Sequence, residues 1–267
     1  MEQERVIVVP CDFSETSRTA VDYALQISSV SDIRVLLLHI VPGRSYIRKA
    51  EDKFKKILKE LPEKYIKYIS YGIRVGNIFV DINRTIQEKK ALFSVMGTHG
   101  LSSAQELTGS RTLKVISNSE VPFLIVQDKP YYNKAFERIL FPIDFKLSRE
   151  KLEWAERIYA IFHSEFYVSP IKYEDDFFRS KQEENRLLTE EFFKQREIPY
   201  TVKDIPDGNI SMNMIRLARQ KRVDIILIDT MPGNNIIDLM LGVPEQEIIA
   251  NKYKIPVLVI NRLPYEL

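Results

Sequence analysis

The sequence contains the same pattern twice. Three segments of the first half recur in the same order in the second half, at offsets of 132 to 134 residues. They are Pro10-Cys11-Asp12-Phe13 with Pro142-Ile143-Asp144-Phe145, Gly76-Asn77-Ile78 with Gly208-Asn209-Ile210, and 121–126 with 255–260. Ordered matches of this kind indicate an internal duplication. The chain is therefore expected to contain two copies of one domain.

The boundary between the copies follows from where the matched segments end. We assign the first copy to residues 1–128 and the second to residues 136–267, with Asp128 to Lys134 as the joint. A chain of 267 residues is long enough for two domains of average size, each of which can bury its own core.

Apolar runs alternate with helical patterns in each copy. Val6 to Val9 is a continuous β-branched run, typical of a strand buried on both faces. Ala20, Tyr23, Ala24 and Ile27 then recur at helical spacing. The same patterns predict strands at 6–9, 35–41, 68–73, 92–96 and 123–126, and at 139–142, 166–168, 200–203, 225–228 and 257–260. This alternation predicts an α/β fold with two tandem open parallel five-stranded sheets and helices on both faces of each.

A glycine-bearing loop follows the predicted strand at 92–96. Gly97 and Gly100 lie just beyond this strand, and Gly109-Ser110 stands where the next helix could begin. Glycines let backbone N–H groups approach an anion, and a helix start adds roughly half a positive charge. Ligands of parallel sheets bind beyond the carboxyl ends of the strands. The loop therefore indicates a phosphate site, with a tight turn as the alternative.

The spacing of these glycines resembles the nucleotide loop of the universal stress protein family. Gly97-x2-Gly100 followed by Gly109-Ser110 follows the family pattern, although residues 101–108 supply eight spacer residues where the family has nine. The resemblance implies an adenine nucleotide alpha hydrolase-like fold and an ATP site in the first domain. It also implies that Asp12 and Val41 contact the nucleotide, with Pro10 beside the base.

Each candidate site residue also has a structural alternative. The Asp12 carboxylate could accept hydrogen bonds from ribose hydroxyls or an adenine amino group, or it could cap the next helix. Val41 could wall the base or belong to the core. Arg111, which the family pattern lacks, could reach a terminal phosphate or remain solvated. The predicted site comprises Pro10, Asp12, Val41, Met96, Gly97, Gly100, Gly109, Ser110 and Arg111.

The second copy lacks the residues that would bind an anion. Aligning the halves places Asp229 opposite Gly97 and Pro232 opposite Gly100, while Val243-Pro244 replaces Ser110-Arg111. A carboxylate repels phosphate, and proline has no N–H to donate. Asp144 remains opposite Asp12, and helix capping explains its presence. We expect the second half to bind no nucleotide and to act as a packing partner.

Charge and motifs exclude several classes of protein. The sequence has 39 Lys and Arg residues against 37 Asp and Glu residues, which leaves a net charge of +2. The overall charge therefore does not favour binding to nucleic acid or to an anionic membrane. No histidine or cysteine cluster has metal-ligand spacing, so Mg²⁺ is expected only as a companion of the nucleotide. The chain has one cysteine, Cys11, no signal-peptide pattern at residues 1–5 and no apolar run of spanning length, which together suit the cytoplasm.

Two functions follow from these patterns. The first is an ATP-binding stress-response module with little or no turnover, whose bound state a protein partner reads through residues 101–108. The second is an interaction protein of the same fold that binds no nucleotide, because the shortened spacer has spoiled the site. No P-loop or dinucleotide fingerprint supports an enzyme beyond slow ATP hydrolysis.

The resemblance also implies how the two domains associate. The family pairs its domains through their last strands, here Phe123 to Val126 and Val257 to Ile260. Antiparallel pairing of these apolar edges within one chain would form an intramolecular pseudo-dimer and protect them from aggregation. The chain could also form a homodimer through its last strands.

Overall fold

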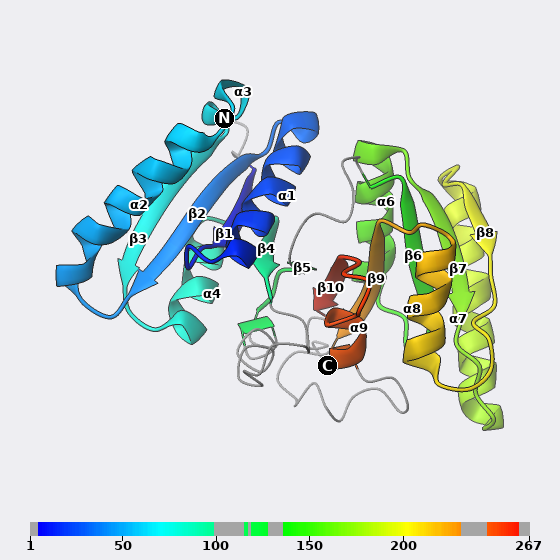
Figure 1. Ribbon diagram of the computed structural model, residues 1–267. Helices are drawn as coiled ribbons and strands as arrows, with labels where there is room; N and C mark the ends of the chain where they lie inside the picture. The colour runs from blue at the N-terminus through cyan, green and yellow to red at the C-terminus, as the bar shows by residue number, and fades with distance from the viewer. Residues whose placement is uncertain (1–4, 99–114, 117–118, 128–135, 231–244, 262–267) are drawn as a thin grey trace. The chain divides into compact units, whose positions relative to one another are not determined.

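The computed structural model describes residues 5–98, 115–116, 119–127, 136–230 and 245–261. The chain divides into two compact units, Met1–Pro130 and Tyr131–Leu267, each of which is described by itself (Figure 1). The predicted joint, Asp128 to Lys134, lies outside the described residues. The expected pairing of the two last strands concerns how the units associate, and it stays a prediction.

Unit 1 contains an open parallel sheet in the strand order β3-β2-β1-β4-β5. Its strands are β1 (Val6–Pro10), β2 (Arg34–Val41), β3 (Ile69–Val75), β4 (Phe93–Gly97) and β5 (Phe123–Val126). Its helices are α1 (Glu15–Ser31), the short 3₁₀ helix η1 (Arg44–Tyr46), α2 (Ile47–Glu60), α3 (Glu63–Ile66) and α4 (Ile78–Glu88). All five strands predicted for this half are confirmed.

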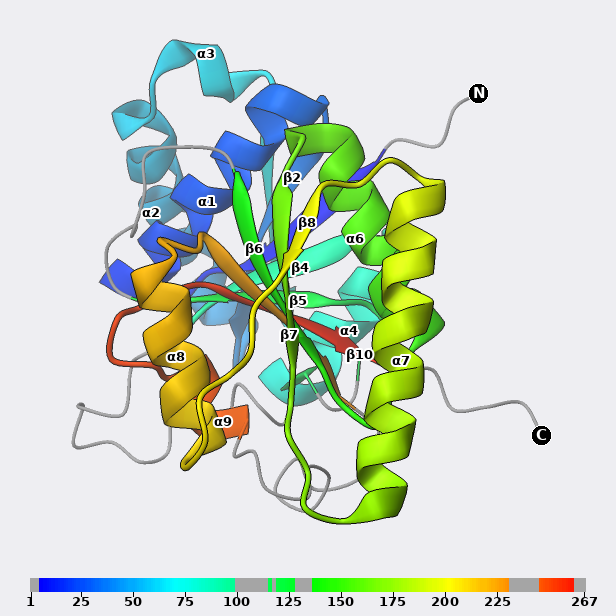
Figure 2. The same ribbon diagram turned by 90° about the vertical axis from the view of Figure 1, so that its right-hand side faces the viewer.

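Unit 2 repeats this order as β8-β7-β6-β9-β10, again parallel. Its strands are β6 (Arg138–Ile143), β7 (Glu165–Pro170), β8 (Tyr200–Val202), β9 (Ile225–Thr230) and β10 (Val257–Asn261). Its helices are α6 (Arg149–Phe162), α7 (Asp176–Gln195), α8 (Ile210–Gln220) and α9 (Glu245–Ile249). Figure 2 shows α7 on one side of this sheet and α8 on the other, so both faces are covered. The predicted α/β fold, with five parallel strands in each unit, is confirmed.

Burial explains the apolar runs. Ile7, Val8 and Val9 of β1 are each 0% exposed, as expected for a central strand covered on both faces. Polar residues begin the helices that follow the strands: the side chain of Ser14 caps α1, and that of Asn77 caps α4. No helix in the described part of the chain is long and apolar enough to cross a membrane.

Candidate functional site

The sheet of unit 1 has a switch in strand order between β1 and β4. From β1 the chain continues through α1 to β2 on one side, whereas β4 lies on the other side of β1 and pairs with β5. Such a switch leaves a crevice at the carboxyl ends of the strands, where ligands of open α/β sheets bind. A pocket of about 190 Å³ lies at these strand ends. It is lined by Pro10, Cys11, Asp12, Ser17, Leu38, His39, Ile40, Ile78, Ile82, Met96 and Gly97.

The turn between β1 and α1 forms one wall of this pocket. Phe13 has a φ of 68°, a left-handed conformation that bulky residues rarely adopt. The Ser14 amide donates to Asp12 Oδ1 at 2.9 Å, and the Ser14 hydroxyl donates to the same oxygen. Ser14 Oγ in turn accepts from the amide of Ser17 at 3.2 Å. Ser14 is therefore the helix cap, and Asp12 supports the turn with its carboxylate facing the pocket.

Hydrogen bonds keep the exposed Asp12 carboxylate ionised. Partial burial would raise the pKa of this group, but the hydrogen bonds from Ser14 and Ser17 outweigh burial and hold the pKa below its usual value. Asp12 therefore presents acceptor oxygens at neutral pH. The neighbouring thiol behaves differently, because burial raises the pKa of Cys11 and keeps it protonated.

His39 is a pocket residue that the sequence analysis missed. Its Nδ1 lies 2.6 Å from the carbonyl oxygen of Cys11, and the Cys11 amide donates to the carbonyl of Leu38 at 2.8 Å. Because a carbonyl oxygen only accepts, Nδ1 is the donor in this hydrogen bond. The imidazole also packs against Phe13, with ring centroids 4.5 Å apart. The one available signal was a lone histidine near the end of an otherwise apolar strand.

Gly97 ends β4 where this strand meets the first turn of α1. A Cβ at this position would lie 2.4 Å from the carbonyl oxygen of Thr16 and 3.0 Å from the amide nitrogen of Ser17. Real side chains do not approach backbone atoms this closely, so only glycine fits. Gly97 therefore lets the strand end and the helix start share one edge of the pocket.

The structure brings together four of the nine predicted site residues. Pro10, Asp12, Met96 and Gly97 all line the pocket. Val41 is not among the lining residues; it is buried, and its carbonyl oxygen accepts from the Gly76 amide at 3.0 Å. Its neighbour Ile40 lines the pocket in its place. The other four predicted residues, Gly100, Gly109, Ser110 and Arg111, lie outside the described residues.

At the corresponding place in unit 2, buried side chains of that unit are hydrogen-bonded to one another and to the backbone. Asp229, opposite Gly97, is buried and accepts from Ser148 Oγ at 2.8 Å and from the Ser148 amide at 3.2 Å. Ser148 caps α6 as Ser14 caps α1, so Lys151 stands where unit 1 has Ser17. Lys151 is also buried, and its Nζ donates to the carbonyl oxygen of Pro142 at 2.7 Å. A lysine and an aspartate thus replace a serine and a glycine.

The expectation that Asp144 caps a helix is wrong. The cap of α6 is Ser148, four residues further along the chain. Asp144 Oδ1 accepts from the Phe145 amide at 2.6 Å and from the hydroxyl of Tyr173. The turn from Asp144 to its cap is two residues longer than the turn from Asp12 to Ser14, so the two aspartates occupy different positions relative to their helices.

Within the described ranges there is no group of three or more His, Cys, Asp or Glu residues that could hold a metal ion. The geometry defines a class of protein: a tandem α/β protein with a pocket at the strand-order switch in its first unit. Residues 4–127, which make up nearly all of unit 1, match the model of the universal stress protein family.

Known universal stress proteins are similar to this chain in sequence or in structure. Two universal stress proteins of Methanocaldococcus jannaschii are 26% and 27% identical to this chain over 154 and 137 residues. These matches cover 46% and 45% of this chain and 94% and 81% of the relatives. The crystal structure of a universal stress protein from Archaeoglobus fulgidus superimposes with a TM-score of 0.78 at 21% identity, over 98% of this chain and 100% of that one. The tandem arrangement is thus shared along the full length.

Proposed function

We propose that unit 1 binds an adenine nucleotide, with ATP as the expected ligand, and that the chain acts as a stress-response module with little or no turnover. The observation that carries this proposal is the pocket at the strand-order switch, where Asp12, Met96 and Gly97 meet. The match of residues 4–127 to the universal stress protein family supports it, and so does the acidic, ionised character of Asp12.

The pocket volume indicates which part of the nucleotide these residues hold. About 190 Å³ is below the roughly 300–1,000 Å³ of complete ligand pockets, so it suits a base rather than a whole nucleotide. Pro10, Ile40 and Met96 offer apolar contact to the ring system, and Asp12 offers an acceptor for a ribose hydroxyl or the adenine amino group. In this proposal the glycine loop after β4 binds the phosphates and the Mg²⁺ that accompanies them. Arg111 is a further phosphate ligand.

Unit 2 has a different role in this proposal. A nucleotide at the equivalent place would have to displace Lys151 and Asp229, both of which are buried and hydrogen-bonded. A buried carboxylate would also repel phosphate. Unit 2 therefore packs against a partner without binding nucleotide. We expect the module to act in the cytoplasm, and a protein partner to read the state of residues 101–108.

Low turnover is consistent with the chemistry of the pocket. The buried thiol of Cys11 has a raised pKa and is a poor nucleophile at neutral pH. Asp12 already accepts two hydrogen bonds from Ser14, so it is poorly suited to act as a general base. Phosphate release from ATP at a rate above the protein-free control would contradict this part of the proposal.

The alternative function is an interaction protein that binds no nucleotide. The eight-residue spacer at 101–108, one residue shorter than in the family pattern, favours it. A thermal shift with ATP separates the two functions. At about 100 times the dissociation constant, one bound ligand adds roughly 2.7 kcal/mol to the free energy of unfolding. Several degrees of stabilisation are expected for the wild type.

The matched variants are Asp12→Ala and Asp144→Ala, since the two residues are counterparts in the duplicated units. Asp12→Ala should abolish most of the ATP-dependent shift, whereas Asp144→Ala should keep it. Equal loss in both variants, or no shift in the wild type, would favour the interaction protein.

A further inference from the structure

The helix α7 differs from its counterpart α2 in the side chains that it buries. The buried residues of α2 are all apolar, namely Ala50, Phe54 and Ile57. Phe54 stacks on Tyr71 of β3 with ring centroids 4.7 Å apart, so aromatic rings lie between α2 and β3. The buried residues of α7 are instead Gln182, Thr189 and Phe193, so two of the three are polar. Polar side chains on the inward face of a helix need partners or a ligand.

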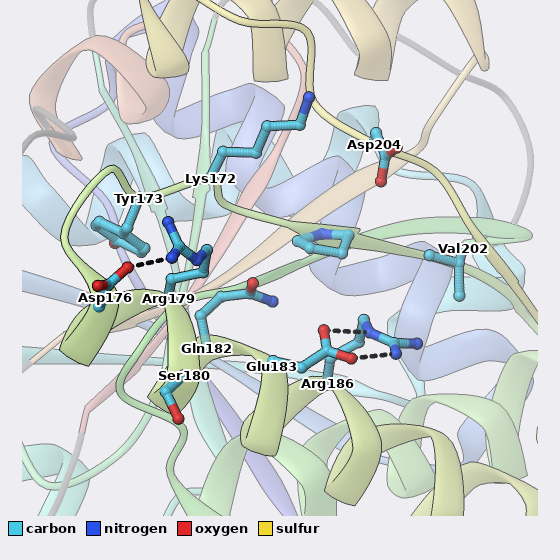
Figure 3. Close-up of a pocket in the computed structure, with 11 residues that line it drawn as sticks. Lys172, Tyr173, Asp176, Arg179, Ser180, Gln182, Glu183, Arg186, Val202 and Asp204 are labelled. Atoms are coloured by element: carbon cyan, nitrogen blue, oxygen red, sulfur yellow. Dashed lines mark hydrogen bonds and ion pairs between the residues drawn. The ribbon is translucent and has the colours of Figure 1, made fainter.

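A pocket of about 840 Å³ lies between α7 and the carboxyl ends of β7 and β8 (Figure 3). Pro170 at the end of β7 and Val202 at the end of β8 provide its apolar walls. Gln182 of α7 and Asp204 beyond β8 also line it. Its volume lies within the roughly 300–1,000 Å³ typical of small-molecule sites. This pocket is separate from the place in unit 2 that Lys151 and Asp229 occupy, since neither residue lines it.

Gln182 is a buried polar residue of this pocket, and its side-chain nitrogen is the atom of interest. Its side chain is 6% exposed, and its Nε2 has no hydrogen-bond partner in the part of the chain that the structure describes. The neighbouring polar residues on the same face are satisfied: Asn185 Nδ2 donates to the carbonyl of Asp144 at 2.9 Å, and Thr189 Oγ1 donates to the carbonyl of Asn185 at 2.8 Å. A buried donor without an acceptor requires an explanation, and a bound ligand that supplies the acceptor is one.

The charges around the pocket are balanced in pairs. Lys172 Nζ lies 3.0 Å from Asp207 Oδ1, Arg179 pairs with Asp176, and Arg186 pairs with both Glu183 and Glu190. Figure 3 shows the second pair and the bidentate Arg186–Glu183 pair along α7. No surplus of positive charge is therefore available for a phosphate group.

Asp204 carries the remaining charge of the lining. It is exposed at the pocket rim, and within the described ranges the structure records no hydrogen bond or ion pair to its carboxylate. The pocket thus offers one buried amide donor, one exposed carboxylate acceptor and two apolar walls.

We propose that this pocket of unit 2 binds a neutral polyhydroxylated small molecule of sugar size. A hydroxyl group both accepts and donates, so one ligand can accept from Gln182 Nε2 and donate to the Asp204 carboxylate. The C–H faces of such a molecule fit the walls formed by Pro170 and Val202. A phosphorylated ligand would meet Asp204 and the carboxylates of the paired residues without an unpaired cation to offset them.

Saturation-transfer difference NMR on the full chain tests this proposal, with glucose, maltose and trehalose as probes and glucose 6-phosphate and adenosine for comparison. At least one neutral sugar should show saturation transfer with a dissociation constant of about 1 mM or below. Loss of one hydrogen bond should weaken this binding by about tenfold in Gln182→Leu and in Asp204→Ala. Gln195→Leu, an exposed position on the same helix, is the matched control and should bind as the wild type.

Three outcomes would overturn the proposal. These are no transfer from any neutral sugar at about ten times a 1 mM dissociation constant, transfer that both pocket variants leave unchanged, and Gln182-dependent transfer from adenosine or glucose 6-phosphate alone. Circular dichroism checks that each variant folds. If Gln182→Leu fails to fold, the exposed variant Asp204→Ala decides the question by itself.

Discussion

Replacement of Gly97 by alanine places a methyl group against the backbone of α1. The added Cβ would lie 2.4 Å from the carbonyl oxygen and 2.6 Å from the carbonyl carbon of Thr16. These atoms belong to the first turn of a helix that packs on β1, β4 and β5, so they cannot move as a flexible side chain would. Overpacking of this kind costs about 1–3 kcal/mol, and the rigid neighbour places Gly97→Ala toward the upper end, at about 2–3 kcal/mol.

Thermal unfolding followed by circular dichroism measures this cost. At about 2–4 °C per kcal/mol, the Tm of Gly97→Ala should fall by roughly 4–12 °C. Gly72→Ala is the matched control, because a Cβ there would meet only the Leu36 side chain at 3.7 Å, an ordinary contact. Its Tm should stay within about 2 °C of the wild type. Equal Tm values for both variants would refute the close approach of β4 to α1.

Three further perturbations test other parts of the structure. Asn77→Ala should remove the cap of α4 and cost about 1 kcal/mol in urea unfolding, while Asn77→Ser should keep most of it; equal losses would argue against the cap. Burial raises the pKa of Asp224 despite the two backbone amides that it accepts, so its contribution to stability is lost as pH rises above the usual Asp range. Asp224→Asn should therefore gain stability relative to the wild type as the pH rises above the usual Asp range, and a difference that stays constant with pH would contradict this reasoning. Asp229→Ala should cost about 1–3 kcal/mol by leaving Ser148 unsatisfied, yet it should not change the thermal shift with ATP; a changed shift would place nucleotide in unit 2.

The candidate site could be predicted from the sequence only in part. Pro10, Asp12, Met96 and Gly97 could be predicted because they lie at or just beyond the ends of strands whose order along the chain is regular. The sequence could not show whether Ile40 or Val41 faces the crevice, because β2 is apolar on both faces. Asp144 was misassigned because the length of a loop decides which residue caps the next helix.

The sequence by itself determined the duplication, the strands and helices, and the class of fold, since local periodicity and ordered repeats depend on neighbouring residues. Only the tertiary structure decided which side chains meet. Gly97 lies against Thr16, and Asp229 against Ser148, 81 residues apart along the chain. The pocket beside α7, where Gln182 Nε2 has no partner among the described residues, likewise depends on the helix, the strand ends and the connecting loops together. Contacts between distant segments arise from packing, and no local pattern encodes them.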